Sequence, residues 1–231
     1  MNTKWLLTPE EFSLIWTRET RQDRRPYPLH TIPTPETPDT AQRLRHRFLR
    51  RTDPELTAAL MLCARSDATT VTLFGERTAG PAVRAFAAVA QQRAGVLIGL
   101  PDAVSVMVCP AERLGRELVE AVGSAPAGRL APLREPQDAV LRDAGGHRCA
   151  EHETRGDAAL FRRKLNEPVD GRGFITVSVA PANPLSPPTR HRTWLDFSDD
   201  GRYLLTTDAD LTLTPVNDED FAAALMHMAR L

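Results

Sequence analysis

The residues with the most evident chemical potential lie close together, between His147 and His152. The stretch reads His-Arg-Cys-Ala-Glu-His, so two imidazoles, a thiol and a carboxylate fall within six residues of the 231-residue chain. Such side chains can bind zinc, and a cysteine close to a histidine can act as a nucleophile. However, no second group of cysteines and histidines lies nearby, and the preceding Gly145-Gly146 favours a surface loop. The alternative to a binding protein is therefore a metal- or thiol-dependent cytoplasmic enzyme that uses His147, Cys149 and His152.

Three aspartates, Asp196, Asp199 and Asp200, could coordinate a divalent cation. They lie directly before Gly201, however, and aspartate and glycine are residues that tolerate the backbone angles of a hairpin turn. We therefore interpret these acidic residues as part of a turn, and we predict neither a metal site nor a cofactor.

Five arginines between Arg43 and Arg51 lie on one side of an expected helix. A basic helix face is found in nucleic-acid-binding arms, but it is also an ordinary solvated surface. No series of aromatic residues that could stack on bases accompanies it. Phosphate-binding loops, G-x-S-x-G elbows and H-E-x-x-H helices are also missing from the sequence. We therefore expect a binding protein rather than an enzyme, and no nucleic-acid partner.

The composition narrows the class of protein further. The 29 basic and 30 acidic residues give a formal net charge of −1, which predicts no general attraction to nucleic acid or anionic membrane. No apolar run is long enough to span a bilayer, and the N-terminus does not resemble a secretory signal. The three cysteines are scattered, as in proteins of a reducing compartment. We expect a cytoplasmic protein without membrane insertion.

The element around which the chain is organised is residues 190–207, which we predict to be a β-hairpin. Trp194 and Asp196 would face one side of the sheet, and Leu195 and Phe197 the other, because side chains alternate along a strand. Large aromatic residues in such a hairpin are most simply core residues. The aromatic side chains in question are Trp194 and Tyr203.

Apolar periodicity and capping residues predict the other elements. Thr8, Pro9 and Glu11 form a helix start with a capping box, and Asp53 with Pro54 begins another helix. Strands are expected at 27–32 (an edge strand), 69–75, 83–91 (where alanines also allow a helix), 94–100, 103–109, 174–180 and 211–213. Further helices are expected at 41–48, 110–123, 137–143, 157–166 and 218–230.

The two halves of the chain are similar in pattern. A shift of 107 positions superposes Leu114 on Phe221 and Leu118 on Leu225, and the strands before them also align. Such self-similarity is typical of a duplicated unit. We predict an α+β fold in a single domain over residues 1–231, with pseudo-repeat halves at about 1–123 and 136–231 and a connector at 124–135.

Several stretches, taken in order, resemble the EspG family. The first runs from Trp5 to Phe12 and is followed by Trp16; the next are Pro26-Tyr27-Pro28-Leu29 and Asp53-Pro54-Glu55-Leu56. The last is Thr193-Trp194-Leu195-Asp196 together with Gly201-Arg202-Tyr203-Leu204-Leu205. We interpret the family-like residues as supporting the fold rather than touching a partner: Trp5, Phe12, Trp16, Trp194, Asp196, Gly201 and Tyr203.

The resemblance implies a central antiparallel sheet with helical bundles beside it and quasi-two-fold internal symmetry. It implies a cytoplasmic chaperone of actinobacterial type VII (ESX) secretion, without catalysis or cofactor. The implied partner is the PPE subunit of a PE–PPE heterodimer, whose apolar tip the chaperone covers until secretion. The identity of the client and the self-association of the chaperone stay open.

The resemblance also places client contacts on a loop between early strands and on the C-terminal half. If residues 27–32 are the first strand, that loop is 76–82, which is shorter than in other family members. The C-terminal hairpin and the helices at 137–143 and 157–166 are candidates by position, and Phe161 and Leu165 are either interface or core. The candidate client-binding residues are Glu76, Arg77, Thr78, Ala79, Gly80, Pro81, Phe161 and Leu165.

Overall fold

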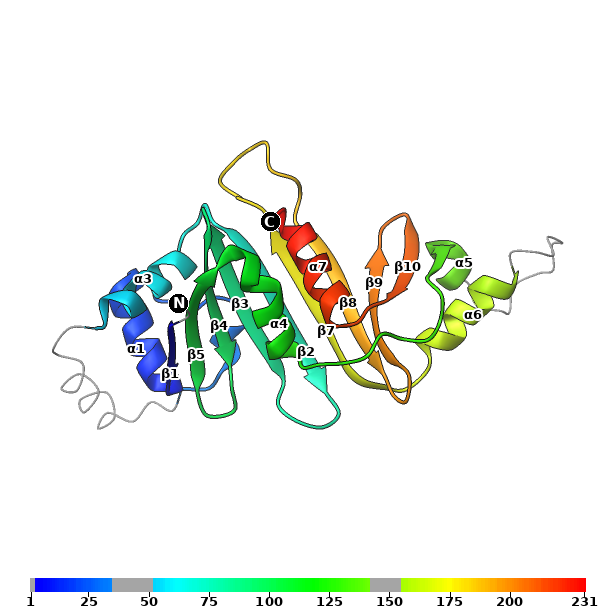
Figure 1. Ribbon diagram of the computed structural model, residues 1–231, viewed down its shortest axis with the longest axis horizontal. Helices are drawn as coiled ribbons and strands as arrows, with labels where there is room; N and C mark the ends of the chain where they lie inside the picture. The colour runs from blue at the N-terminus through cyan, green and yellow to red at the C-terminus, as the bar shows by residue number, and fades with distance from the viewer. Residues whose placement is uncertain (1–2, 35–51, 142–154) are drawn as a thin grey trace.

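The computed structural model describes residues 3–34, 52–141 and 155–231. The helix expected at 41–48 with its arginines, and the cluster of His147, Cys149 and His152, lie outside these residues. Over the described residues the fold is α+β, as predicted, with one ten-stranded antiparallel sheet and six α-helices (Figure 1). No helix in this part of the chain is both long and apolar enough to cross a membrane.

The sheet joins the two halves of the chain at its centre. Its strands are β1 (Thr3–Leu7), β2 (Thr69–Arg77), β3 (Val83–Ala90), β4 (Arg93–Gly99), β5 (Val104–Pro110), β6 (Leu133–Pro136), β7 (Val169–Ser178), β8 (Arg190–Phe197), β9 (Gly201–Thr207) and β10 (Asp210–Pro215). Their order is β1-β5-β4-β3-β2-β7-β8-β9-β10-β6. The pair β2–β7 therefore connects N-terminal strands on one side to C-terminal strands on the other.

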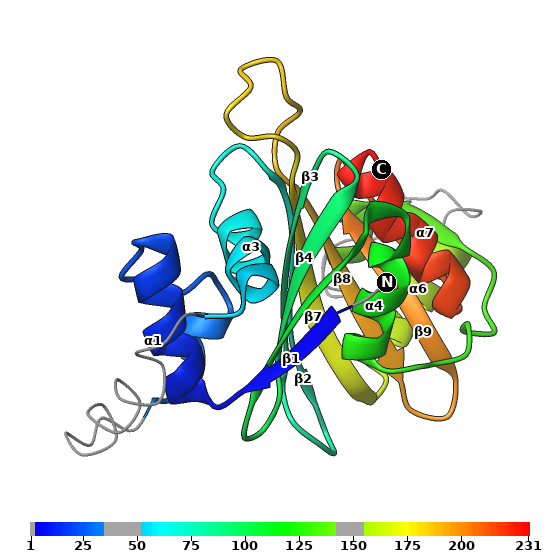
Figure 2. The same cartoon turned by 60° about the vertical axis from the view of Figure 1, so that its left-hand side comes forward.

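Helices pack on both faces of the sheet. The helices are α1 (Pro9–Thr20), α3 (Pro54–Cys63), α4 (Leu114–Val122), α5 (Gln137–Leu141), α6 (Arg155–Leu165) and α7 (Asp218–Ala229), with short 3-10 helices η1 (Leu29–Thr31) and η2 (Ala111–Arg113). α4 and α7 lie side by side over one face. On the opposite face α1 and α3 cover the N-terminal strands (Figure 2). The helices α5 and α6 pack on the C-terminal strands, against the face that points away from α4 and α7.

Three hydrophobic clusters correspond to these three helix pairs. The largest lies under α4 and α7 and includes Leu73, Trp194 and Phe221. The second lies under α1 and α3 around Trp16, and the third under α5 and α6 around Phe161. Strand alternation explains the division, because successive residues of a strand point to opposite faces.

Most predicted helix starts are confirmed. The Thr8 side chain accepts a hydrogen bond from the Glu11 backbone, and the Glu11 side chain accepts one from the Thr8 backbone, which completes the capping box. Asp53 caps α3 through the Glu55 backbone amide. The helix predicted from Pro110 is also confirmed, as η2 followed by α4, and ends at Gly123.

Three expectations about strands need correction. The edge strand predicted at 27–32 is wrong: this segment forms η1 and packs against β3 and β4. The predicted connector contains a strand, β6, which pairs with β10. β7 begins at Val169 rather than at Phe174, because pairing with β2 extends it through two glycines. The segment at 83–91, for which a helix was also possible, forms the strand β3.

Candidate functional site

At the centre of the sheet, one face is left open by the helices that the structure describes. Odd-numbered residues of β2 and β7, such as Leu73 and Ile175, are buried beneath α4 and α7. Even-numbered residues of the same strands point to the other face, between the α1–α3 pair and the α5–α6 pair. We call this surface the central face; its strand residues are Thr72, Phe74, Phe174, Thr176, His191 and Thr193.

Phe174 is the most exposed aromatic residue of the central face. It lies directly opposite Phe74 on β2 and opposite Thr193 on β8, yet 65% of its surface is exposed. A phenylalanine on a strand in the middle of a large sheet normally buries most of its surface. Its exposure here marks a position that another apolar surface can cover.

The segment around η1 forms one wall of the central face. The ring of Tyr27 meets that of Phe74 edge-on, with centroids 5.6 Å apart, and 48% of Tyr27 is exposed. Burial of the rest of its side chain raises the pKa of Tyr27, so the phenol is neutral at physiological pH. The Arg84 guanidinium donates to the Thr31 hydroxyl at 3.0 Å and ties this wall to β3. Tyr27 contacts Phe74, and Phe174 lies opposite Phe74, so we call these three residues the aromatic strip.

Polar side chains border this strip. At one end Arg172 and Glu76 face each other across β7 and β2, with 3.7 Å between Nη2 and Oε2, and both side chains are mostly exposed. On the other side the Thr176 hydroxyl and Nδ1 of His191 are 3.2 Å apart. An apolar centre with a polar rim is the usual arrangement of a protein–protein interface.

The opposite wall is formed by α6, which Lys164 fixes to the β8–β9 turn. The Lys164 side chain is only 3% exposed, and its ammonium group lies 2.6 Å from Oδ2 of Asp200 and 4.1 Å from the centroid of the Phe197 ring. Burial alone would lower the pKa of Lys164, but its hydrogen bonds to Asp200 and Glu167 outweigh burial and raise it. Asp200 also accepts from the Tyr203 hydroxyl at 2.8 Å. The wall is therefore held by a buried charge pair.

The predicted loop lies at the end of the sheet beside this face. Glu76 and Arg77 are the last residues of β2, and Thr78 donates from its backbone amide to Asp170 at 2.8 Å. Thr78, Ala79, Gly80 and Pro81 are all exposed. A groove of about 960 Å³ brings Arg77, Thr78 and Ala79 together with the connector and the β8–β9 turn. The predicted loop therefore lies next to the β8–β9 turn of the C-terminal half.

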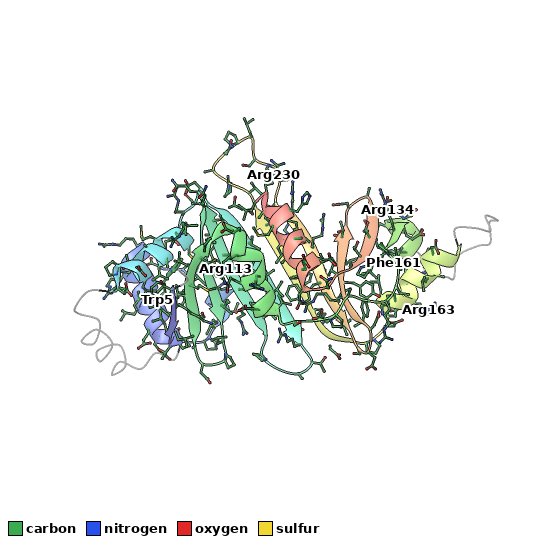
Figure 3. All side chains as sticks on the ribbon, viewed as in Figure 1. Trp5, Arg113, Arg134, Phe161, Arg163 and Arg230 are labelled. Atoms are coloured by element: carbon green, nitrogen blue, oxygen red, sulfur yellow. The ribbon has the colours of Figure 1, made fainter. Side chains whose placement is uncertain are left out.

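The two predicted helix residues differ in their accessibility. Phe161 is fully buried in the third cluster, whereas its neighbour Arg163 is exposed (Figure 3). Leu165 is partly buried against the same cluster. The core alternative therefore applies to Phe161, because a residue without exposed surface cannot contact a docked protein.

The family-like residues pack inside the fold. The Trp194 indole lies against Gly75 and Gly173 of the central strand pair, where any added Cβ would meet its ring. Asp196 accepts two hydrogen bonds from buried Arg202, at 2.6 and 3.0 Å. Gly201 has a φ of +153° at the turn and lies against Ala127 of the connector. The remaining residues of this group are Phe12, Trp16 and Tyr203, which are buried, and Trp5, which donates to Asp53.

The aspartates of the hairpin have partners within the protein. Asp196 is paired with Arg202, and Asp200 with Lys164, while Asp199 has the left-handed φ of +60° that the turn requires. These contacts support the interpretation of the acids as turn residues. No group of three metal-ligating side chains occurs among the described residues. Burial raises the pKa of the Cys63 thiol, and that of Cys109 to about 11, so both are protonated at neutral pH.

Sequence reasoning missed the residues of the central face. Phe174 belongs to a strand whose other face carries Ile175 and Val177, so an aromatic residue on the outward side was a visible signal. The position of Tyr27 beside the central face could not be predicted, because its segment was expected to be a strand. Neither residue could be assigned to an open surface without knowing which parts of the sheet the helices cover.

Three comparisons relate the chain to known proteins. The sequence model of the EspG family matches residues 8–227. The fold is similar to that of the Mycobacterium tuberculosis type VII secretion system chaperone EspG5, solved in complex with a PE25–PPE41 dimer. The TM-score is 0.61 at 10% sequence identity, and the similarity covers 99% of this chain and 96% of that chain. Comparison with curated protein sequences gives no match.

Proposed function

Because the chain belongs to the EspG family, we propose that it is a cytoplasmic chaperone that holds a PE–PPE-type client for a type VII (ESX) secretion system. EspG family proteins are chaperones rather than enzymes. The similar EspG5 structure contains a PE25–PPE41 dimer, which supports a helical heterodimer as the client class. The client contact is made through the PPE subunit, whose apolar tip the chaperone covers.

The central face is the observation that carries this proposal. It exposes Phe174 and part of Tyr27 between two helical walls, and charged residues border it. An apolar helical tip placed here would bury these rings together with its own apolar surface, which removes an aggregation hazard. The rim pair of Glu76 and Arg172 would favour clients with complementary charges.

The loop at 76–82 extends the proposed contact at one end of the central face. Glu76 already belongs to the rim, and the exposed residues Thr78 to Pro81 continue from it. Leu165 is half-buried on the α6 wall and can contribute its exposed part. Phe161 has no surface to contribute, so it is left out of the proposed interface.

The proposed single domain over residues 1–231 has quasi-two-fold symmetry. Each half supplies a four-strand series followed by a helix: β2 to β5 with α4, and β7 to β10 with α7. The two helices pack against each other, and both pairs of residues related by the 107-position shift are buried between helix and sheet: Leu114 and Phe221, Leu118 and Leu225. The seam between the halves, β2–β7, carries the central face.

Co-expression with the PE–PPE-like pair encoded nearest to the gene tests this function. Affinity capture of the chain followed by size-exclusion chromatography should give a discrete soluble heterotrimer, while the client expressed alone should be insoluble. Absence of a complex with any such pair would contradict the proposed function. Metal analysis of the purified chain is a useful companion, because one equivalent of tightly bound zinc would instead favour the enzyme alternative.

A further inference from the structure

We propose that the β7–β8 loop, residues 179–189, is a second contact arm for the same client, with Leu185 as its apolar anchor. This inference rests on the proposed function, and it names a contact outside the central face and outside the loop at 76–82. The arm would bind the side of a client whose apolar tip lies on the central face.

Leu185 is an apolar side chain that is mostly exposed to solvent, which is energetically unfavourable. It has 89% of its surface exposed, the largest value among the large apolar residues that the structure describes. Packing of the loop on the protein itself does not explain this leucine, because Leu185 belongs to none of the three hydrophobic clusters of the described residues. A leucine held at the tip of a projecting loop is suited to entering a hydrophobic depression on another protein.

The loop is ordered by its own hydrogen bonds. The amide of Asn183 donates to the Ala180 carbonyl and the amide of Ser186 to the Asn183 carbonyl, both at 2.9 Å. The Asn183 side chain accepts from the Leu185 amide at 3.0 Å. Four prolines restrict the same segment: Pro181, Pro184, Pro187 and Pro188. Little conformational entropy would therefore be lost when Leu185 binds a partner.

The base of the loop is part of the central face. The strand residues that lead into it, Phe174, Thr176 and Ser178, all point to that face. The hydroxyl groups of Ser178 and Thr189 lie 3.1 Å apart where the loop begins and ends. Figure 2 shows the loop rising beyond the end of the sheet and leaning toward the side of α1 and α3, which is the side of the central face. A client on the central face would therefore meet the loop.

The spacing fits the end of a helical client. Phe174 and Ser178 are four residues apart on β7, which corresponds to roughly 13 Å at the rise of a β-strand. The loop that carries Leu185 continues from the end of β7 beyond the end of the sheet (Figure 1). Two packed helices, each about 10 Å in diameter, span about 20 Å. A client that presents two helices can therefore cover Phe174 with one part and contact Leu185 with another.

The loop at the other end of the β2–β7 seam differs from the proposed arm in its length and in its apolar residues. The β2–β3 connection, residues 78–82, is shorter and has no large apolar side chain, whereas residues 179–189 are longer and carry Leu185. The two hairpins project from opposite ends of the sheet (Figure 1). Of these two loops, the longer one, which carries the large apolar residue, therefore belongs to the C-terminal half.

A competition experiment tests the arm with the intact complex. A tagged Leu185→Ser variant and the untagged wild-type chain are co-expressed with one client pair, and their ratio in the client complex is measured by mass spectrometry. We expect the variant to be under-represented by about tenfold. Leu6→Ser is the matched control, because Leu6 is also exposed, at 63%, but lies on β1 with its side chain toward the α4 face. This control should compete equally with the wild type.

A second measurement locates the contact directly. A photo-crosslinking amino acid at position 185 should attach to the PPE-type subunit. Equal competition by Leu185→Ser together with absence of this cross-link would overturn the arm, while the heterotrimer itself would leave the proposed function intact. If the wild-type chain forms no complex with any client pair, both proposals fail, so the two failures are distinguishable.

Discussion

Phe74 and Phe174 lie directly opposite each other across the antiparallel pair β2–β7, one from each half of the chain. The Tyr27 ring covers Phe74 in part, whereas among the described residues no ring packs against Phe174, which is 65% exposed. The two rings therefore form an apolar strip at the seam of the fold that is only half covered. This asymmetry makes Phe174 the natural anchor for a docked client.

Phe174→Ala should weaken client binding without destabilising the chaperone. Because the ring is mostly exposed, its removal should change the free energy of unfolding by less than about 1 kcal/mol. Truncation of an aromatic anchor at an interface costs about 2 kcal/mol or more, which corresponds to roughly thirtyfold in affinity. Competition with wild-type chain for one client pair measures the binding, and urea unfolding measures the stability. Equal competition would exclude Phe174 from the interface.

Gly173→Ala should destabilise the seam, because the Trp194 ring occupies the space of the added methyl group. An ideal Cβ at Gly173 would lie 2.1 Å from the indole and 2.6 Å from the Phe74 carbonyl oxygen. Overpacking of this kind typically costs about 1–3 kcal/mol. Urea unfolding measures the stability of Gly173→Ala, Trp194→Phe and the double variant. Together these values form a double-mutant cycle that tests whether the indole causes the loss. If the indole is the obstacle, the double variant should lose less stability than the sum of the two single variants.

The sequence predicted those elements whose signals are local. The capping box of Thr8 and Glu11, the Asp53 cap and the turn before Gly201 depend on residues that are neighbours in the chain. Strand alternation also separated Trp194 from Phe197, which enter different clusters in the structure. These interactions form wherever the segment folds, so they can be recognised before the fold is known.

The missed elements depend on distant partners. β6 is a four-residue edge strand between prolines, and only its pairing with β10 makes it a strand. The beginning of β7 contains Gly171 and Gly173, which suggest a loop, yet the sheet needs a small residue at position 173 to accommodate Trp194. The segment at 27–32 alternates like a strand, but it forms η1 and packs against the face of β3 and β4 instead of pairing at an edge of the sheet. The central face was equally hidden, because its openness depends on where the helices pack.

Arg202→Met should destabilise the protein strongly. The Arg202 side chain is 1% exposed, holds Asp196 in a bidentate ion pair and donates to the Gly123 carbonyl at 2.9 Å. Its loss would leave Asp196 without its cation in a partly buried site, and breaking such a pair costs about 3 kcal/mol. Urea unfolding at neutral pH measures this effect.

The matched control for Arg202 is Arg134→Met. Arg134 also pairs with an aspartate, Asp210, at 2.8 Å, but 75% of its side chain is exposed. An exposed ion pair contributes less than about 1 kcal/mol, so this variant should unfold close to the wild type. Similar losses in the two variants would contradict the role assigned to the buried pair.

Lys164→Met should lower stability in a way that depends on pH. Burial would raise the pKa of Asp200, but its hydrogen bonds from Lys164, Arg129 and Tyr203 lower it below its ordinary value of 3.8. A lowered carboxyl pKa gives stability that is present above that ordinary value and is lost as the pH falls through the folded-state pKa. The pKa of Lys164 is raised above 10.5, so its contribution is present below pH 10.5 and lost at higher pH.

The difference in stability between the wild type and Lys164→Met should therefore be constant between about pH 5 and pH 10, at about 2–3 kcal/mol, and should shrink below about pH 4. Urea unfolding at pH 7 and pH 3 measures the two values. Arg163→Met, an exposed substitution on the same helix, controls for effects on α6 itself and should be close to neutral. Because Lys164 holds the α6 wall against the β8–β9 turn, Lys164→Met should also compete less well for the client. A loss of stability that is the same at both pH values would indicate that packing of the lysine, rather than its charge, holds the wall.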